Sequence, residues 1–181
     1  VIRNTIRELE YQGMLAELVG AEVINLHAGG AYGNKETALE RLLKNIIKLP
    51  KPVLSRLTFE NDDISFTPAD LLPVCQKLQT PMVYDVHHHR CNPDELTIEA
   101  ATERVMETWQ AVDREPYFHI SSPKNGWHDG SPKPHADYID PADFPSCWQG
   151  LTITVDVEAK AKELAVLRLM KDLEHVSLKS P

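Results

Sequence analysis

Short apolar runs alternate with longer amphipathic segments over most of the 181-residue chain. Each run has the length of a buried β-strand and is bounded by polar or turn-forming residues. The pattern predicts strands at residues 22–27, 53–60, 82–86, 117–121 and 151–158. Runs of consecutive apolar positions, in place of strict alternation, are typical of strands that are covered on both faces.

Helices are predicted between these strands and at the start of the chain. The leucines and isoleucines of segment 34–49 recur every three or four positions, as they do on one face of a helix. The same periodicity predicts helices at 2–20, 67–79, 95–112 and 159–175. Thr67 is the expected N-cap of its helix and Pro68 the first helical residue, because a hydroxyl accepts from a free amide there and proline needs no amide partner.

This alternation predicts an α/β fold in which right-handed crossovers join parallel strands. Two architectures fit the pattern, an open doubly wound sheet and a TIM-type (β/α) barrel. No G-x-G-x-x-G motif follows the first predicted strand, which disfavours the dinucleotide-binding form of the open sheet. No linker or low-complexity segment divides the chain, so residues 1–181 are expected to form a single domain.

Side chains that can bind metal stand at or just beyond the C-terminal end of every predicted strand. They are His27, Glu60, Asp85 together with His88, His119, and Glu158. Active sites of parallel α/β folds form at this edge, and in a barrel the strand ends converge on one axis. Carboxylates and histidines gathered there without cations would repel one another or be poorly solvated. The sequence therefore predicts a divalent metal site, which accounts for the histidine run at 87–89.

The donor types narrow the metal but not the reaction. Oxygen and nitrogen donors without cysteine favour Mn, Zn or Fe over a thiolate site. Carboxylates that bridge divalent ions are typical of sites that activate water and hold a phosphodiester for in-line attack. A single-metal sugar isomerase uses a similar set of residues, so both reactions stay open at this point.

Composition indicates the setting of the protein. The net charge of −8 disfavours a nucleic-acid binder, because affinity for a duplex rests on cationic groups that contact phosphates. Bound divalent ions would offset that charge locally. The three cysteines form no C-x-x-C pair, and no apolar run approaches the ~18–20 residues of a membrane span. We therefore expect a cytoplasmic protein with free thiols and no membrane association.

Five motif groups together resemble the UV damage endonucleases of bacteria and fungi. They are NLHAGGAYGNK, LTFENDD, YDVHHHRCNP, HISSPK with HADYI, and DVEAKAKE with LMKDL, and the likeness runs from about Val1 to Leu173. The resemblance implies a TIM barrel similar to that of endonuclease IV, with up to three divalent ions. These are usually manganese, although zinc also suits the donors. It further implies a DNA repair enzyme that nicks UV-damaged duplex DNA 5′ to the photoproduct, leaving a 3′-hydroxyl and a 5′-phosphate.

The resemblance also implies a set of metal ligands. They are His27, Glu60, Asp85, His88, His119, His135 and Glu158, of which Glu60, Asp85 and Glu158 are the implied catalytic carboxylates. Only His135 lies outside the strand ends, in the long loop 122–145. In the implied scheme Glu60 bridges two ions. Asp85, His119 and Glu158 complete the first ion's site and His27 the second, while His88 and His135 hold a third ion. The histidines without an implied role are His87, His89 and His128.

The length of the chain departs from the family. A closed barrel has eight strands and about 250 residues, whereas the pattern predicts about five βα units in 181 residues. We therefore expect the C-terminal part of a (β/α)8 barrel, without the N-terminal units and inactive as a nuclease by itself. Open strand edges would favour association, so the oligomeric state stays open. Two rivals also stay open, a xylose-isomerase-like enzyme with a small closed pocket and a non-catalytic metal- or DNA-binding fragment.

Two loops that follow predicted strands are expected to contact DNA. The candidate residues are Tyr32 and Lys35 in the first loop and Lys124, Asn125, Trp127 and Lys133 in the second. Lysine and asparagine suit backbone contacts, and an aromatic ring can stack on an unstacked base. The alternative is an ordinary surface loop with Trp127 packed against the protein. The remaining tryptophans, Trp109 and Trp148, and Cys75 are expected in packing roles.

Overall fold

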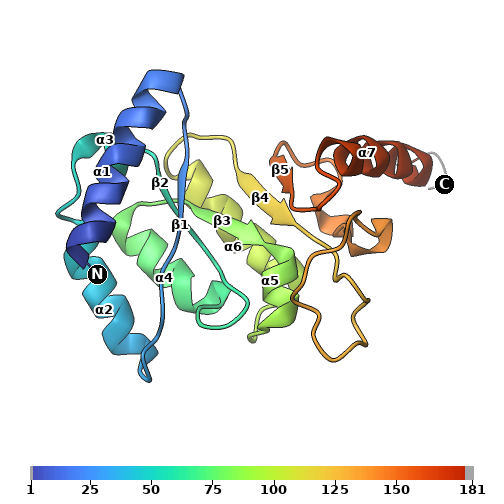
Figure 1. Ribbon diagram of the computed structural model, residues 1–181, viewed down its shortest axis with the longest axis horizontal. Helices are drawn as coiled ribbons and strands as arrows, with labels where there is room; N and C mark the ends of the chain where they lie inside the picture. Colours follow the sequence, from blue (N-terminus) through green and yellow to red (C-terminus); the bar gives the residue numbers. More distant parts are fainter. Residues whose placement is uncertain (1, 178–181) are drawn as a thin grey trace.

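A single parallel sheet organises the computed structural model, which describes residues 2–177 (Figure 1). Its strands are β1 (Ile24–His27), β2 (Leu57–Glu60), β3 (Met82–Asp85), β4 (Tyr117–Ile120) and β5 (Thr154–Val157). They lie side by side in chain order, and every neighbouring pair is parallel. A doubly wound sheet reverses its strand order at a switch point. The uninterrupted order seen here is that of a barrel, and it confirms the predicted fold class.

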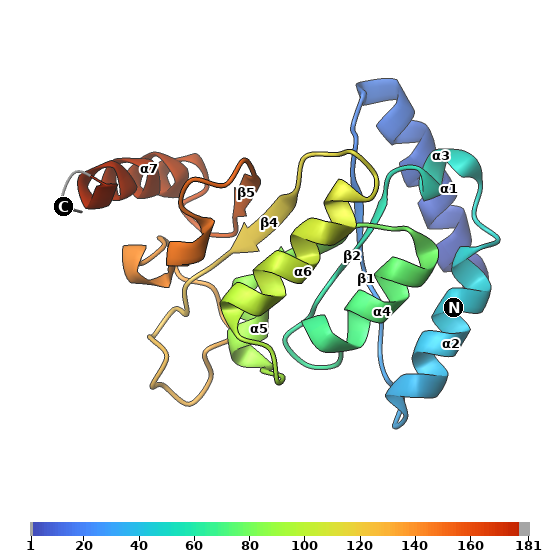
Figure 2. The same ribbon diagram turned by 180° about the vertical axis from the view of Figure 1, so that it is seen from behind.

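The helices lie between the strands along the chain, as predicted. They are α1 (Ile2–Val19), α2 (Lys35–Ile46), α3 (Lys51–Leu54), α4 (Pro68–Leu78), α5 (Val86–Cys91), α6 (Ile98–Gln110) and α7 (Glu163–Ser177). Helices α4 and α6 pack against each other and cover one face of the sheet at β2 and β3, as the view from behind shows (Figure 2). Within the described range, no helix is both long enough and apolar enough to cross a membrane.

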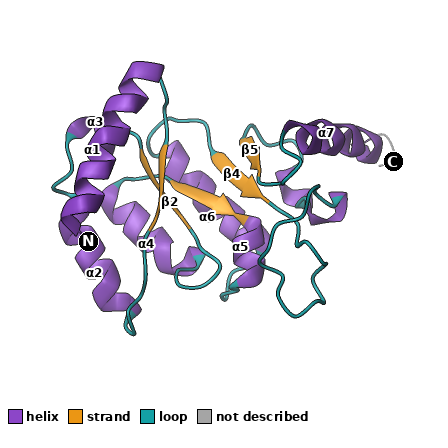
Figure 3. Cartoon of the chain, viewed as in Figure 1, coloured by secondary structure: helices purple, strands orange, loops and turns teal. Residues whose placement is uncertain are grey.

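The sheet is open. Strands β1 and β5 form its two edges, and among residues 2–177 no strand pairs with the free side of either. An open sheet in barrel order agrees with the predicted incomplete barrel. The longest connection runs from β4 to β5 and holds only the short 3-10 helices η1 (Pro141–Asp143) and η2 (Ser146–Trp148) (Figure 3).

Local signals explain where the helices begin. The Thr67 hydroxyl accepts from the amide of Asp70, and the Asp70 carboxylate accepts from the amide of Thr67 at 3.0 Å, which makes a capping box at the start of α4. Pro68 occupies the first turn of that helix. Both predictions for α4 are confirmed. Asn34 and Thr97 cap α2 and α6 in the same way, each accepting from an amide three residues further on.

Several predicted boundaries differ from those of the structure. The strand predicted at 53–60 begins only at Leu57, because the chain at 51–54 forms α3 with a proline in its first turn. The strand predicted at 151–158 covers Thr154–Val157. Residues 86–91 form α5, which had no predicted counterpart. This helix starts directly after β3 because the Asp85 side chain accepts from the amide of His88 at 2.7 Å and caps it.

The core lies between the central strands and the helices that cover them. Phe59, Leu72 and Phe118 are fully buried there. The predicted packing residues Trp109 and Trp148 are buried as well, and each indole N–H has a partner, the Met82 carbonyl at 2.6 Å and the Thr102 hydroxyl at 2.9 Å, respectively. Cys75 is buried as expected. Strands β2, β3 and β4 are thereby held rigidly, and the candidate site stands at their C-terminal ends.

Candidate metal centre

The strand register brings the predicted ligands to one edge of the sheet. His27 of β1 is level with Glu60 of β2, and Asp85 of β3 is level with His119 of β4. Successive strand residues point to opposite faces, so residues at these paired positions project to the same side. The face that α4 and α6 leave uncovered therefore carries the cluster.

Four residues form a buried group at the centre of this edge. Glu60, Asp85, His119 and Glu158 each offer one ligand atom, and these atoms all lie within 4.8 Å of one another. Nδ1 of His119 is 3.2 Å from a carboxylate oxygen of Glu60 and 3.3 Å from one of Glu158. Glu60 and Asp85 are almost fully buried. Three carboxylates packed around one imidazole are costly without a cation.

The hydrogen bonding of Asp85 is incomplete in a way that a bound cation would satisfy. Its Oδ1 accepts from the amide of His88, but its buried Oδ2 has no hydrogen-bond partner among the described residues. The nearest cationic candidate, Nδ1 of His88, lies 3.3 Å away but forms its hydrogen bond with the Asn61 carbonyl at 3.0 Å. Buried carboxylate oxygens are rarely left without a partner. A divalent ion ligated by Oδ2 would supply one.

Two further groups adjoin the buried one. His27, Glu60 and His88 form the first, and His88, His135 and Glu158 form the second, with ligand atoms within 4.8 Å in each. The His27 and His135 rings reach the carboxylates of Glu60 and Glu158, each at 3.6 Å. The structure thus brings together all seven residues of the implied ligand set. It differs from the implied scheme in placing His88 with both outer groups and Glu158 beside His135.

Protonation of His119 and His88 offsets negative charge in the cluster. Burial raises the pKa of Glu60, but hydrogen bonds with His119 and His88 outweigh this and leave it well below its usual range. Burial lowers the pKa of His119, yet Asp156, Glu158 and Glu60 raise it to about 12. Burial also lowers the pKa of His88, but Glu60 and Asp85 raise it to about 9. For Asp85, burial dominates and the pKa is raised. A divalent ion could take over the neutralising role of these protons.

The donor chemistry fits such an ion. Three carboxylates and four imidazoles surround the site, and no thiol belongs to any of the three groups. Oxygen and nitrogen donors in this mixture suit Mn, Fe or Zn. The unpartnered Asp85 oxygen and the carboxylate-faced Nδ1 of His119 would be natural ligand atoms. The residues present therefore fit the divalent ions that the sequence led us to expect.

The predicted DNA contacts lie in two different settings. Tyr32 is exposed on the loop after β1. The ammonium groups of Lys35 and Lys133 are held in ion pairs, with Asp70 at 2.6 Å and with Asp63 at 3.5 Å.

The other predicted DNA contacts lie on the loop after β4. Lys124 and Asn125 are exposed there, and the Asn125 amide donates to Asp129 at 2.7 Å. Trp127 is half-buried, and its indole N–H donates to Asp143 at 2.7 Å.

The histidines without an assigned role lie in different environments. His87 is buried, with its ring 5.2 Å from that of Trp127 and 5.1 Å from that of His135. His89 is buried too, between the Tyr84 hydroxyl at 2.6 Å and the Asp94 carboxylate at 3.0 Å. His128 is exposed. Of the two buried rings, only that of His87 packs against cluster residues, His88 and His135, whereas His89 is held by residues outside the three groups.

Supporting polar residues next to the ligands escaped the sequence analysis. Asn61 makes two hydrogen bonds with the Asp85 backbone, donating to its carbonyl at 2.8 Å and accepting from its amide at 3.0 Å. Asn25 donates to Glu60, and Asp156 faces His119. A signal was available for the last two, because Asn25 and Asp156 stand two positions before a strand-end ligand and so share its face.

Known proteins of one family resemble this chain in sequence and in fold. A model of the family "UV-endonuclease UvdE" matches residues 1–180. A UV DNA damage endonuclease of Bacillus cereus (strain G9842) is 35% identical over 184 residues, covering 97% of this chain and 57% of the relative. One of Bacillus anthracis is 36% identical over 185 residues, with the same coverage. A solved structure, the crystal structure of SacUVDE, aligns with a TM-score of 0.85 at 28% identity, covering 97% of this chain and 60% of that one.

These matches bear on the fold as well as on the family. The high TM-score over nearly the whole chain agrees with the open barrel-type sheet. The chain spans 57% of the length of the Bacillus relatives and 60% of SacUVDE. On the family model and these relatives, the chain belongs to the UvdE family of UV endonucleases.

Proposed function

We propose that this chain forms a large part of the metal-dependent active site of a DNA repair endonuclease, which nicks the strand 5′ to UV photoproducts. The observation that supports this most directly is the set of three overlapping histidine–carboxylate groups at the C-terminal strand ends. Their place in a chain of the UvdE family suits a phosphodiester hydrolase. The Bacillus relatives are named as UV DNA damage endonucleases.

The chain's residues divide into an inner and an outer part of the proposed site. Glu60, Asp85, His119 and Glu158 would hold the inner ion, while His27 and the pair His88 and His135 would extend the site outward. Divalent ions in such a site polarise a phosphodiester and lower the pKa of water. The protein itself contributes rigid placement of the ligands, because the strands that carry them, β2, β3 and β4, pack into the hydrophobic core.

DNA is the proposed partner in spite of the acidic composition. The net charge of −8 disfavours phosphate binding over most of the surface. Divalent ions held at the cluster would reverse that charge locally. The exposed loops after β1 and β4 border the cluster, and they carry Tyr32, Lys124 and Asn125 as the proposed contacts with the strand.

Metal content tests the first half of the proposal. Elemental analysis of the purified protein, after incubation with Mn²⁺ and removal of free ion, should find bound metal in the parent and a marked loss in Glu60→Gln. Glu107→Gln, an exposed site on α6, removes the same charge and is the matched control. Since the imidazoles must release protons to bind an ion, affinity should rise with pH. Equal metal in Glu60→Gln and in the control would contradict the assignment.

DNA cleavage tests the second half. The chain spans 57% of the length of the Bacillus cereus relative. The most informative assay therefore uses a chimera, in which this chain replaces the matching region of that protein. We expect nicking of UV-irradiated duplex that is stimulated by Mn²⁺, little nicking of undamaged duplex, and loss of nicking with Glu60→Gln. Retained metal without nicking would favour a binding role, and conversion of a sugar substrate would favour an isomerase.

A further inference from the structure

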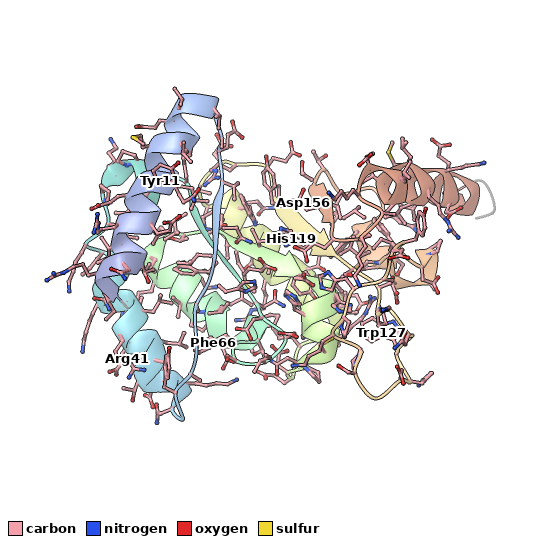
Figure 4. The ribbon with its side chains drawn as sticks, in the orientation of Figure 1. Tyr11, Arg41, Phe66, His119, Trp127 and Asp156 are labelled. Carbon is pink, nitrogen blue, oxygen red and sulfur yellow. The ribbon has the colours of Figure 1, made fainter. Side chains whose placement is uncertain are left out.

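Asp156 stands next to the cluster but belongs to none of its three metal-binding groups. It lies on β5, level with His119 on β4. Its Oδ2 is 3.5 Å from Nε2 of His119 (Figure 4). The carboxylate itself is 62% exposed, so it can remain ionised at little cost. Among the described residues, its side chain pairs with one group, Nε2 of the proposed ligand His119.

The two nitrogens of the His119 ring face different carboxylates. Nδ1 points to Glu60 and Glu158, at 3.2 and 3.3 Å, and so into the buried group. Nε2 points away from that group, to Asp156. A neutral imidazole has one N–H and one lone pair, and the lone pair must be on the nitrogen that binds an ion. The partner of the other nitrogen determines which tautomer is present.

A similar arrangement on the opposite edge of the sheet supports this interpretation. Asn25 on β1 stands two residues before His27, as Asp156 stands two residues before Glu158. The Asn25 amide donates to the Glu60 carboxylate of the neighbouring strand and accepts from the Thr58 hydroxyl at 3.0 Å. Each edge strand thus supplies a polar side chain that contacts a ligand of the adjacent inner strand.

We propose that Asp156 is a positioning residue, which accepts the Nε2–H of His119 and so leaves Nδ1 free to bind a divalent ion. The inference rests on the metal site of the proposed function. It assigns to this residue the role that carboxylates play behind metal-bound histidines, where they fix the tautomer and the orientation of the ring. An exposed carboxylate with a purely solvating role would have no influence on either.

Two measurements test the proposal together, the affinity for metal and an NMR spectrum of the His119 imidazole. In the Zn²⁺-loaded protein, an imidazole ¹⁵N–¹H correlation spectrum, assigned with His119→Gln, should show a proton on Nε2 of His119 and none on Nδ1. Asp156→Ala should lower Zn²⁺ affinity about 10- to 100-fold, the usual effect of removing such a partner. Asp156→Asn keeps an oxygen that can accept, and it should recover part of the loss. Asp137→Ala removes an exposed carboxylate near the site that lacks contact with His119, and it is the matched control.

The possible failures are distinguishable. If the parent protein binds no Zn²⁺ or Mn²⁺, the proposed metal site fails, and this inference fails with it. If the parent binds metal and Asp156→Ala matches Asp137→Ala within twofold, only the role of Asp156 is overturned. A metal-bound Nε2 with a proton on Nδ1 would overturn it as well. Near-ultraviolet circular dichroism of each variant separates a lost partner from a lost fold.

Discussion

Two loops border the same cluster, and they hold their aromatic residues in opposite ways. The loop after β1 presents Tyr32 with 84% of the residue exposed. The loop after β4 packs Trp127 against the protein, with the indole N–H bound to Asp143 and the Arg90 guanidinium 5.6 Å from the ring centre. Both residues were predicted to contact DNA. Their surroundings suit only the first for stacking against a base.

The backbone of the exposed loop sharpens the contrast. The amide of Asn34 donates to the carbonyl of Ala31 at 3.1 Å, which closes a tight turn. Tyr32 and Gly33 are its central residues, with φ of +49° and +84°. Positive φ at both positions is the pattern of a type I′ turn, which favours Gly, Asn or Asp. A tyrosine there combines backbone strain with an exposed ring. Such an outlier beside a reactive site motivates a functional role.

Removal of the packed ring should have the largest effect on stability. Trp127→Ala deletes the contacts with His87 and Arg90 together with the bond to Asp143. We expect a loss of about 3 kcal/mol, near the lower end for buried tryptophans because this one is half-buried. Urea denaturation of the metal-free protein measures it. Trp127→Phe keeps a ring and should lose only about 1 kcal/mol. A loss below 1 kcal/mol for the alanine variant would show that the ring is not held as described.

Replacement of Asp143 should have the next largest effect on stability, because its carboxylate binds both Trp127 and Ser122. The carboxylate is buried and accepts from the Trp127 indole and from the Ser122 hydroxyl. Asp143→Ala leaves two donors without an acceptor, so we expect a loss of about 2 kcal/mol. Thermal unfolding provides the measurement, with the exposed Asp129→Ala on the same loop as control. Equal melting temperatures for the two variants would contradict the network.

The fold was largely predictable from periodicity. Apolar runs and amphipathic spacing located all five strands and most helices, because burial on both faces of a parallel sheet leaves a strong pattern. The errors occurred where a short-range interaction overrides that pattern. Pro52 lies in the first turn of α3, which extends into the predicted strand, and the Asp85 side chain caps α5 directly after β3. Side-chain caps of this kind occupy one or two residues and change no periodicity.

The site was predictable at the strand ends and not beyond them. His27, Glu60 and His119 follow from strand periodicity and from the rule that active sites form at this edge. His135 came only from family resemblance, since it lies in a long loop without periodicity. The packing of Trp127 depends on Asp143, sixteen residues further along the chain. Contacts over such distances leave no local pattern, so the two loops looked alike before the structure separated them.

Replacement of Tyr32 should separate stability from binding. Asparagine adopts positive φ readily, so Tyr32→Asn should leave the fold as stable or raise its stability by about 0.5 kcal/mol. If the ring stacks on a base, the same change should weaken binding of UV-damaged duplex by about 1–2 kcal/mol. Urea denaturation and fluorescence anisotropy give the two numbers, and Tyr32→Phe should bind like the parent. Unchanged DNA affinity in Tyr32→Asn would remove the functional reason for the strained turn.

The smallest expected effect distinguishes the lysines of the packed loop. Lys133 is tied to the neighbouring loop, donating to the Asp63 carbonyl at 2.7 Å and pairing with its carboxylate. Lys124 is exposed and has no ion pair with any described residue. Each lysine that contacts a phosphate adds about 0.9 to the slope of log affinity against log salt concentration.

Lys124→Gln should therefore reduce that slope by about 1, whereas Lys133→Gln should leave it unchanged. Both substitutions remove one positive charge from the same loop, so each is the control for the other. Anisotropy titrations of UV-damaged duplex over a range of salt concentrations give the slopes. A reduced slope for Lys133→Gln with an unchanged one for Lys124→Gln would mean that the ion pair with Asp63 opens on binding. The loop after β4 would then contact DNA through the side chain that is held in the free protein.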